Sequence, residues 1–283
     1  MFRIRWVLIF ILFSSNLFTW YYVSQYLDQK LVVSFLDVGQ GDAILIKAPS
    51  GRTVLIDGGP GKNILGLLAK ELPLFSDSID LLIESHPDTD HVGGLPDVLG
   101  RYSVRGIIKP CLDSANPYDV ALTELAKIRQ VVEVCGAPGE IIDLGGGAKI
   151  EILYAGAKLG TKESKTNDAS IIAKLSYGDN SFLFVGDTSI AVEKYLIYTE
   201  GNNLQADVYK VSHHGSRESN DEKFLKTIKP QISIISVGVD NRYGHPHQET
   251  LASLALLESV IFRTDQMGTI VLESNGNMIK KIK

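Results

Sequence analysis

The segment at positions 85–94 reads Ser85-His86-Pro87-Asp88-Thr89-Asp90-His91-Val92-Gly93-Gly94. It places two imidazoles and two carboxylates within six residues, directly after an apolar run over residues 79–83 that is typical of a buried strand. The two glycines that follow let the backbone turn tightly towards a helix. Four metal-binding side chains on the loop that leaves a buried strand are difficult to explain by stability alone. The segment therefore predicts a metal site, and a polar, solvated turn with incidental histidines is the weaker interpretation.

The composition of the chain bounds the classes of protein to which it can belong. Its 283 residues are 45% hydrophobic and 22% charged, which is ordinary for a globular protein. The formal net charge is −5, so no global basic field attracts nucleic acid, and this argues against a passive DNA-binding module. A polyanion would have to be attracted locally, by bound metal or by a small basic patch such as Lys158, Lys162 and Lys165.

The N-terminal residues predict a membrane anchor. Residues 6–23 form an apolar stretch without acidic residues, preceded by Arg3 and Arg5. Its length is near the lower limit for spanning a bilayer, and no convincing cleavage site follows it. We therefore expect an uncleaved transmembrane signal anchor over residues 1–29, with a buried core helix as the alternative. The positive flank predicts a single-pass topology in the cell membrane, with the N-terminus in the cytoplasm and residues 30–283 outside it.

Cys111 and Cys135 are the two cysteines of the chain. Each follows a short apolar run, and their separation is far from the C-x-x-C spacing of a zinc knuckle. The sequence leaves open whether they are buried free thiols or form a disulfide. A location outside the cytoplasm would permit the disulfide chemically.

The remainder of the chain alternates short apolar runs with glycine-rich turns and helical segments. Residues 31–56 are expected to form an antiparallel meander. The later alternation of strand, loop and helix predicts a layered α/β architecture in which helices cover the faces of the sheets. All six histidines fall in three loops, each directly after an apolar strand, which is where a rigid scaffold presents catalytic ligands.

Polar residues at these strand ends suit a two-metal centre. Two ions that share a bridging carboxylate lie roughly 3.5–4 Å apart, clamp a phosphate and generate hydroxide near neutral pH. Asp187 follows an apolar run and is the expected bridge, with a capping aspartate before a helix as its alternative. In the pair His213-His214 we expect one imidazole to be a ligand and the other a general acid or substrate contact. Asp57 is either a carboxylate that orients a metal-bound histidine or an ordinary turn residue.

The order H-x-D-x-D-H-x-G-G, then G-D at a strand end, then H-H-G-S resembles the metallo-β-lactamase superfamily of αββα sandwich hydrolases. More narrowly, residues 31–283 resemble the extracytoplasmic hydrolase domain of ComEC-type competence proteins, through the motifs F-L-D-V-G-Q-G-D-A, L-I-D-G-G, S-H-P-D-T-D-H-V-G-G, N-D-A-S, V-S-H-H-G-S and N-R-Y-G-H-P-H. The resemblance implies an α/β fold, a four-layer αββα sandwich that follows the N-terminal transmembrane helix. It also implies a hydrolase domain over residues 30–283 with two divalent metal ions, Zn²⁺ or Mn²⁺.

The resemblance assigns roles to individual residues. The implied metal ligands are His86, Asp88, Asp90, His91, Asp187 and His214. The implied catalytic residues are His213, His245 and Asp90. The implied substrate-binding residues are Asn167, Tyr243 and Ser216, and the ring of Tyr243 is suited to stacking a base. It stays open which of His213 and His214 binds metal.

The sequence departs from the superfamily pattern in two places. Asp88 stands where the second histidine of H-x-H-x-D-H is usual, and no histidine occurs between His91 and His213. Asn167, with Asp168 beside it, stands where a further ligand is expected, unless it is a simple turn residue. Both changes replace nitrogen by oxygen, which favours Mn²⁺ over Zn²⁺ at one site.

These features together predict a membrane-anchored, dinuclear metal-dependent phosphodiesterase that degrades nucleic acid outside the cytoplasm, with single-stranded DNA as the expected substrate. ComEC-type proteins carry a long polytopic channel region, whereas this chain has one predicted anchor, so any channel is expected to be a separate protein. One alternative is hydrolysis of another phosphodiester, such as a phosphocholine group on an envelope polymer. Another is a non-catalytic module that captures DNA for a partner channel.

Overall fold

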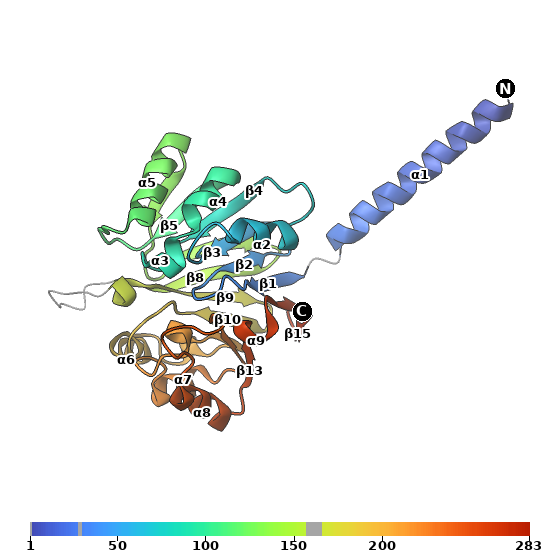
Figure 1. Ribbon diagram of the computed structural model, residues 1–283. Helices are drawn as coiled ribbons and strands as arrows, with labels where there is room; N and C mark the ends of the chain where they lie inside the picture. The colour runs from blue at the N-terminus through green and yellow to red at the C-terminus, as the bar shows by residue number, and fades with distance from the viewer. Residues whose placement is uncertain (1, 28–29, 157–165) are drawn as a thin grey trace.

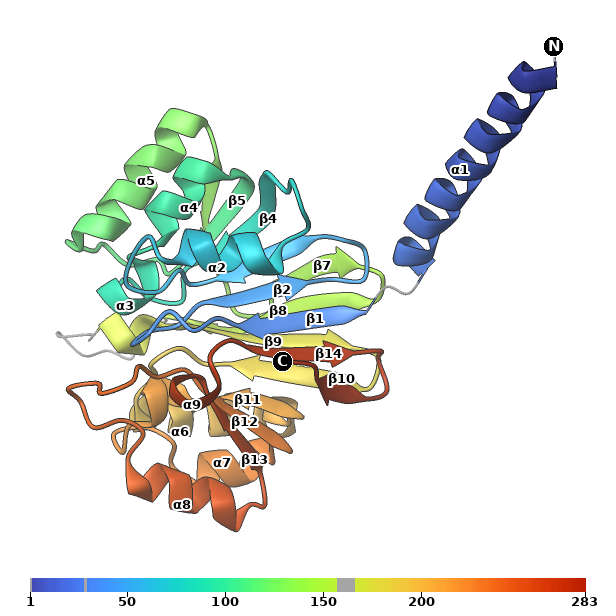
Figure 2. The same ribbon diagram turned by 45° about the vertical axis from the view of Figure 1, so that its right-hand side comes forward.

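Two β-sheets pack face to face, and helices cover their outer faces (Figures 1 and 2). The structure is a computed structural model that describes residues 2–27, 30–156 and 166–283. From one side to the other, the layers are helix, sheet, sheet and helix. The sandwich is therefore the four-layer α/β arrangement that the sequence predicts.

The first sheet combines strands from the N-terminal half with the last two strands of the chain. Within the described residues it has eight strands, in the spatial order β15 (Ile279–Lys281), β14 (Ile270–Ser274), β1 (Leu31–Phe35), β2 (Ile44–Lys47), β3 (Thr53–Ile56), β4 (Ser78–Ile83), β5 (Ser103–Lys109) and β6 (Val132–Cys135). The first three strands in sequence form the expected antiparallel meander, whereas β3 to β6 run parallel. Since parallel strands end at the same edge of a sheet, the loops after β3 and β4 emerge side by side.

The second sheet is built from the C-terminal half. In the part of the chain that the structure describes it has seven strands, in the order β13 (Val260–Arg263), β12 (Ile232–Ile235), β11 (Val208–Lys210), β10 (Asn180–Phe184), β9 (Ile171–Tyr177), β8 (Ala148–Ala155) and β7 (Ile141–Gly145). β7 to β10 are antiparallel, and β10 to β13 are parallel. The loops after β10, β11 and β12 therefore also share one edge.

Helices fill the two outer layers and the connections. Their bounds are α2 (Ile64–Glu71), α3 (Thr89–Val92), α4 (Leu95–Arg101), α5 (Pro117–Arg129), α6 (Ile190–Thr199), α7 (Glu222–Ile228), α8 (Gln248–Leu256) and α9 (Thr264–Met267), with short 3₁₀ turns η1 (Thr166–Ala169), η2 (Gly201–Leu204) and η3 (Ser212–Gly215). One apolar cluster, including Phe35 and Phe182, lies between the sheets. Two more join the sheets to the helices that cover them, through residues such as Leu99 and Leu196. Central strands are thus buried on both faces, which explains their nearly continuous apolar sequences.

The N-terminal helix α1 (Phe2–Leu27) stands clear of the sandwich (Figures 1 and 2). Its large apolar side chains are exposed, for example Trp6 at 61%, Phe10 at 71% and Trp20 at 73%. They therefore do not form the buried core helix that the sequence left as an alternative. Within the described residues, no helix combines the length and the apolar character needed to cross a membrane.

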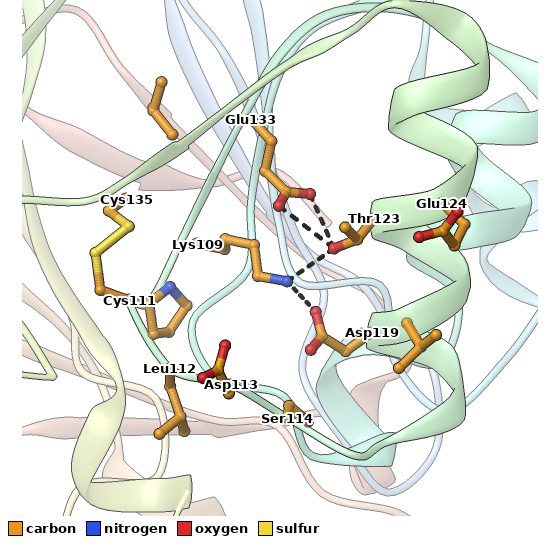
Figure 3. A pocket seen from close by; sticks show the side chains of 13 residues that line it. Lys109, Cys111, Leu112, Asp113, Ser114, Asp119, Thr123, Glu124, Glu133 and Cys135 are labelled. Atoms are coloured by element: carbon orange, nitrogen blue, oxygen red, sulfur yellow. Dashed lines mark hydrogen bonds and ion pairs between the residues drawn. A yellow bond between two sulfur atoms is a disulfide. The ribbon is translucent and has the colours of Figure 1, made fainter.

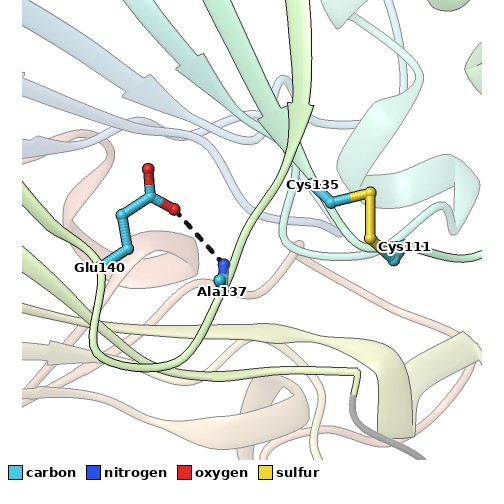
Figure 4. Close-up of a disulfide and its surroundings, with 4 residues drawn as sticks. All are labelled: Cys111, Cys135, Ala137 and Glu140. Atoms are coloured by element: carbon cyan, nitrogen blue, oxygen red, sulfur yellow. Dashed lines mark hydrogen bonds between the residues drawn. A yellow bond between two sulfur atoms is a disulfide. The ribbon is translucent and has the colours of Figure 1, made fainter.

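A disulfide joins Cys111, in the loop after β5, to Cys135 at the end of β6 (Figure 4). Both cysteines are exposed, so the structure differs from the buried free thiols that the sequence also allowed. The chain between them includes α5. Asn116 at the start of that helix accepts the Tyr118 backbone N–H and donates from Nδ2 to Thr89 Oγ1 at 3.1 Å. The cross-linked segment is therefore connected directly to the predicted metal loop.

Glu193 in α6 is a buried carboxylate whose titration should affect the stability of the fold. Its two oxygens accept the backbone N–H groups of Asn220 at 2.6 Å and Asp221 at 2.8 Å. Burial nevertheless raises the pKa of Glu193 from 4.5 to about 7. The folded state then holds this proton more tightly than the unfolded state, so the free energy of unfolding should fall as the pH rises from 4.5 to about 7.

Urea denaturation across this pH range measures the effect. The variant Glu193→Gln cannot titrate and should show a flatter pH dependence, even though it loses one of the two hydrogen bonds. An unchanged slope in the variant would show that other groups control the stability in this range.

Candidate metal centre

The predicted ligands converge at the edge of the sandwich where the parallel strands end. The segment 85–94 leaves β4 and contains α3, Asp187 lies between β10 and α6, and His214 lies in η3 after β11. Four residues each place a donor atom within 4.8 Å of the others: Asp90, His91, Asp187 and His214. Loops from both sheets thus contribute to one cluster.

Asp187 lies between two imidazoles. Its Oδ1 is 3.4 Å from His91 Nε2, and its Oδ2 is 3.4 Å from His214 Nε2. The same nitrogen of His214 is 3.4 Å from Asp90 Oδ2. A carboxylate that presents one oxygen to each of two donor groups has the arrangement that a bridging ligand requires.

His86 and Asp88 extend the cluster beyond His91. The ring centroids of His86 and His91 are 4.0 Å apart. His86 Nε2 is 3.9 Å from Asp88 Oδ2, and the imidazole is fully buried whereas the side chain of Asp88 is 38% exposed. The cluster therefore opens towards solvent on the side of Asp88.

Each of the three buried histidines is held through the same ring nitrogen. The Nδ1 atom of His86 is 3.0 Å from Ser85 Oγ, that of His91 is 2.8 Å from Asp57 Oδ2, and that of His214 is 2.8 Å from the Ser236 carbonyl oxygen. Hydrogen bonds of this kind fix the orientation and tautomer of metal-binding imidazoles. All three Nε2 atoms are consequently left for the cluster.

Four donor atoms of the cluster are buried without a hydrogen-bond partner among the described residues. They are Nε2 of His86, His91 and His214, and Oδ1 of Asp187. A buried polar atom without a partner costs about 1–3 kcal/mol, so four at one place indicate that another kind of partner belongs there. Imidazole nitrogen and carboxylate oxygen are common ligands of zinc, manganese and iron. The donor set therefore fits divalent metal ions.

The charges in the cluster stabilise one another. Burial acts to raise the pKa of Asp187, but the adjacent His214 and His91 hold it well below its usual value. Burial acts to lower the pKa of His91, yet the carboxylates of Asp187 and Asp57 raise it well above 6.5. A metal ion must displace the protons of these imidazoles, so its apparent affinity should increase with pH.

His213 and His245 lie on the more open side of the cluster. His213 Nε2 is 3.8 Å from Asp187 Oδ2, and its side chain is 27% exposed. The ring of His245 lies 5.5 Å from that of His213 and 6.4 Å from that of His214. Burial together with these two histidines lowers the pKa of His245 to about 4. The structure thus places both predicted catalytic histidines next to the metal-binding group, and His214 is the more buried of the neighbouring pair.

The loop after β11 has an unusual backbone. His213, His214 and Gly215 all have positive φ values, of 48°, 52° and 85°. A β-carbon at Gly215 would lie 2.5 Å from the β-carbon of Pro246, so only glycine permits the close approach of the two histidine-bearing loops. Non-glycine residues in this region of φ are strained and occur preferentially at functional sites.

Tyr243 lies at the mouth of the cluster, with its ring 5.7 Å from that of His245. Half of its surface is exposed. Tyr243 therefore borders the cluster, and its contact with substrate stays a prediction.

Asn167 and Ser216 are placed differently. Asn167 lies in η1, where its carbonyl oxygen accepts hydrogen bonds from Ser170. Ser216 is buried, and its hydroxyl oxygen accepts the Glu218 backbone N–H at 3.2 Å. Among the described residues, neither side chain has a hydrogen bond or ion pair to a predicted metal ligand. The predicted basic patch of Lys158, Lys162 and Lys165 lies outside the described residues.

The ion pair that lies next to His214 was not predicted from the sequence. Lys210 Nζ is 2.7 Å from Asp42 Oδ2, and both side chains are at most 2% exposed. The other oxygen of Asp42 is 3.5 Å from His214 Nδ1. A lysine inside the apolar run before His213-His214 was the available signal, because a lysine is rarely fully buried without a partner.

Replacement of Asp57 by asparagine should weaken metal binding. Asp57 accepts the Ser85 backbone N–H at 2.7 Å and the Ser85 hydroxyl at 2.6 Å in addition to its contact with His91. Asparagine keeps the size but removes the charge and one acceptor, so we expect a loss of about 10- to 100-fold in metal affinity. Isothermal titration with Mn²⁺ or Zn²⁺ measures this affinity, and Asp143→Asn, which changes an exposed aspartate on β7, is the control. Equal affinities for all three proteins would show that Asp57 is an ordinary turn residue.

A cavity of about 480 Å³ beside α5 and the disulfide contains a different group of charges (Figure 3). Lys109 Nζ donates to Asp119, and to Thr123 Oγ1 at 3.1 Å. Burial raises the pKa of the nearby Glu84, which directly precedes Ser85, to about 8. Lys109, Asp119 and Thr123 thus bond to one another, and they lie outside the metal-binding cluster.

The chain belongs to the metallo-beta-lactamase superfamily, whose family model matches residues 36–239. This finding and the cluster of metal-binding donors define it as a metal-dependent hydrolase of that fold. The predicted superfamily is therefore confirmed.

Relatives among curated proteins confirm the narrower resemblance. The chain is 30% identical over 259 residues to ComE operon protein 3 of Bacillus subtilis, covering 84% of this chain and 32% of that protein. It is 24% identical over 243 residues to competence protein ComA of Neisseria gonorrhoeae, covering 86% of this chain and 32% of that protein. The chain thus spans about a third of the length of these relatives.

Solved structures agree on the fold. The metallo-beta-lactamase fold protein YhfI from Bacillus subtilis matches with a TM-score of 0.58 over 87% of this chain and 100% of that chain, at 12% sequence identity. At this identity the likeness concerns the architecture alone.

Proposed function

We propose that this chain is a dinuclear metal-dependent phosphodiesterase that cleaves nucleic acid, with single-stranded DNA as its preferred substrate. The observation that carries the proposal is Asp187, which presents one oxygen towards His91 and the other towards His214. A pure binding module has no need of a carboxylate in this bridging position. The relationship to a protein named for competence supports a nucleic-acid substrate.

The ligands divide into two groups around Asp187. His86, Asp88 and His91 would hold one ion, and Asp90 and His214 would hold the other. When bound, the two ions would clamp a phosphate and supply hydroxide near neutral pH. The mixture of nitrogen and oxygen donors suits Zn²⁺ or Mn²⁺, and the aspartate at position 88 favours Mn²⁺ on its side.

The two histidines outside the ligand set handle protons. Since the pKa of His245 is lowered to about 4, its ring is neutral at pH 7 and can accept a hydrogen bond from substrate or water. His213 is partly exposed beside Asp187, where its Nε2 can hold the proton needed by the leaving oxygen. These roles follow from position, because both rings border the cluster without lying inside it.

Hydrolysis assays on the purified chain test the proposal. Single-stranded DNA, duplex DNA and a chromogenic phosphodiester would be incubated with Mn²⁺, with Zn²⁺ or with a chelator. We expect metal-dependent cleavage of single-stranded DNA that the chelator abolishes. Binding without cleavage would support a capture module, and cleavage of the small ester alone would exclude nucleic acid as the substrate.

We also propose that α1 associates with the cell membrane and that the sandwich lies outside the cytoplasm. The basic residues Arg3 and Arg5 and the exposed apolar side chains of α1 support this location. A channel that moves DNA would then be a separate partner protein. Membrane fractionation with carbonate washing, followed by protease protection of intact cells, measures both attachment and side.

A further inference from the structure

A cavity of about 440 Å³ lies directly beside the metal-binding cluster. Thr89 and Asp90 of the metal loop line one side of it, Arg242 and Tyr243 line another, and Gln40 closes it from the first sheet. Asp90 belongs both to this cavity and to the candidate metal cluster. A molecule bound in the cavity is therefore adjacent to the reacting position.

The loop that carries Arg242 and Tyr243 is held in place by Asn241. The Nδ2 of Asn241 donates to the carbonyl oxygens of His245 at 2.7 Å and Gly238 at 3.1 Å, and its Oδ1 accepts the His245 backbone N–H at 3.0 Å. Gln40 Oε1 accepts the backbone N–H of Gly238 at 3.3 Å. The backbone of the loop is thus held at both ends, which positions Arg242 and Tyr243 along the cavity.

Arg242 and Tyr243 form an exposed pair, the Arg242–Tyr243 platform, in which the guanidinium group lies over the phenol ring. The guanidinium carbon lies 4.9 Å from the centre of the phenol ring, and Nη2 donates to the Tyr243 hydroxyl at 2.8 Å. Behind them, the ring of His245 is inclined by 24° to that of Tyr243. The rings of Tyr243 and His245 thus form a series that extends from solvent to the metal cluster.

We infer that the Arg242–Tyr243 platform binds one unpaired nucleobase next to the scissile phosphate, which makes it the substrate-selecting subsite of this enzyme. The inference rests on the proposed phosphodiesterase function. The guanidinium plane of Arg242, which lies over the ring of Tyr243, can stack a base irrespective of sequence, and its positive charge attracts the adjoining phosphate. A base in a duplex is stacked and paired already, so the subsite selects single strands.

The same platform disfavours a choline ester. A quaternary ammonium group is recognised by free aromatic faces that form cation–π contacts. Here Arg242 already lies over the ring of Tyr243, and its positive charge repels a second cation. Of the two substrate classes that the sequence allows, the nucleotide is thus the better match.

Two twelve-unit oligomers test the inference, one of thymidylate and one of abasic phosphates with the same charge. The purified chain with Mn²⁺ should cleave the thymidylate with a kcat/KM higher by about 10- to 100-fold, which is the usual effect of one stacked base. Tyr243→Leu should abolish this preference, so that the variant cleaves the two oligomers with equal kcat/KM. Tyr243→Phe retains the ring and should retain the preference. Tyr198→Leu, which removes a tyrosine exposed at 89% on α6, is the matched control.

The outcomes separate the two proposals. If the unmodified chain cleaves neither oligomer, the phosphodiesterase function fails. If it cleaves both oligomers equally, or if Tyr243→Leu keeps the full preference for thymidylate, the enzyme is a nuclease but the platform is not its base subsite. Faster hydrolysis of 4-nitrophenylphosphorylcholine than of thymidylate would overturn the assigned substrate class.

Discussion

Asp187→Asn is expected to abolish metal-dependent hydrolysis while the sandwich remains folded. The substitution preserves size, but it removes the negative charge that faces both His91 and His214 at 3.4 Å. Loss of a residue that merely supports a ligand typically costs 10- to 100-fold, so loss of the bridging group itself should exceed about 100-fold in kcat/KM. The bound metal, measured by mass spectrometry after gel filtration, should fall below that of the unmodified chain.

A suitable control for this variant is Asp179→Asn. Asp179 lies in the exposed turn before β10, at the opposite end of the strand that precedes Asp187. It should behave as the unmodified chain in both assays. Phosphodiester cleavage by Asp187→Asn at more than about a tenth of the normal rate would refute the two-metal mechanism.

Lys210→Met should be among the most destabilising substitutions in the chain. It leaves the carboxylate of Asp42 buried without its cation, since the two groups are 2.7 Å apart and almost fully enclosed. Breaking such a pair typically costs about 3–5 kcal/mol in the free energy of unfolding. Urea denaturation of the metal-free protein measures the loss.

The double variant Lys210→Met with Asp42→Leu distinguishes charge burial from lost packing. Removing both charges eliminates the unpaired carboxylate, so the double variant should be more stable than Lys210→Met alone. If it is less stable by the sum of the two single effects, the pair contributes no coupling and the residues act independently.

The sequence predicts which loops form this site better than it predicts the contacts between their side chains. Residues such as His86 and Asp187 follow apolar strands, and parallel strands end at a common edge, so their convergence follows from the order of elements.

Contacts between distant side chains are less accessible to sequence reasoning. Asp42 and Lys210 come from different sheets, and nothing in the local pattern of either one names the other. The local hydrogen bond of Ser216 was also not foreseen: the sequence predicts a contact with substrate, and in the structure the buried hydroxyl oxygen accepts the Glu218 backbone N–H. Local hydrogen bonds of this kind compete with any role in substrate binding.

The division of the donors between the sheets couples ion capture to assembly of the molecule. His86 and His91 emerge from the first sheet, whereas Asp187 and His214 emerge from the second. Neither sheet with its covering helices carries a full set of ligands. Metal ions therefore bind tightly only after the two halves of the sandwich have packed together, and the binding energy stabilises that packing. Removal of the metal by a chelator should accordingly weaken the packing between the two sheets before either half of the sandwich unfolds.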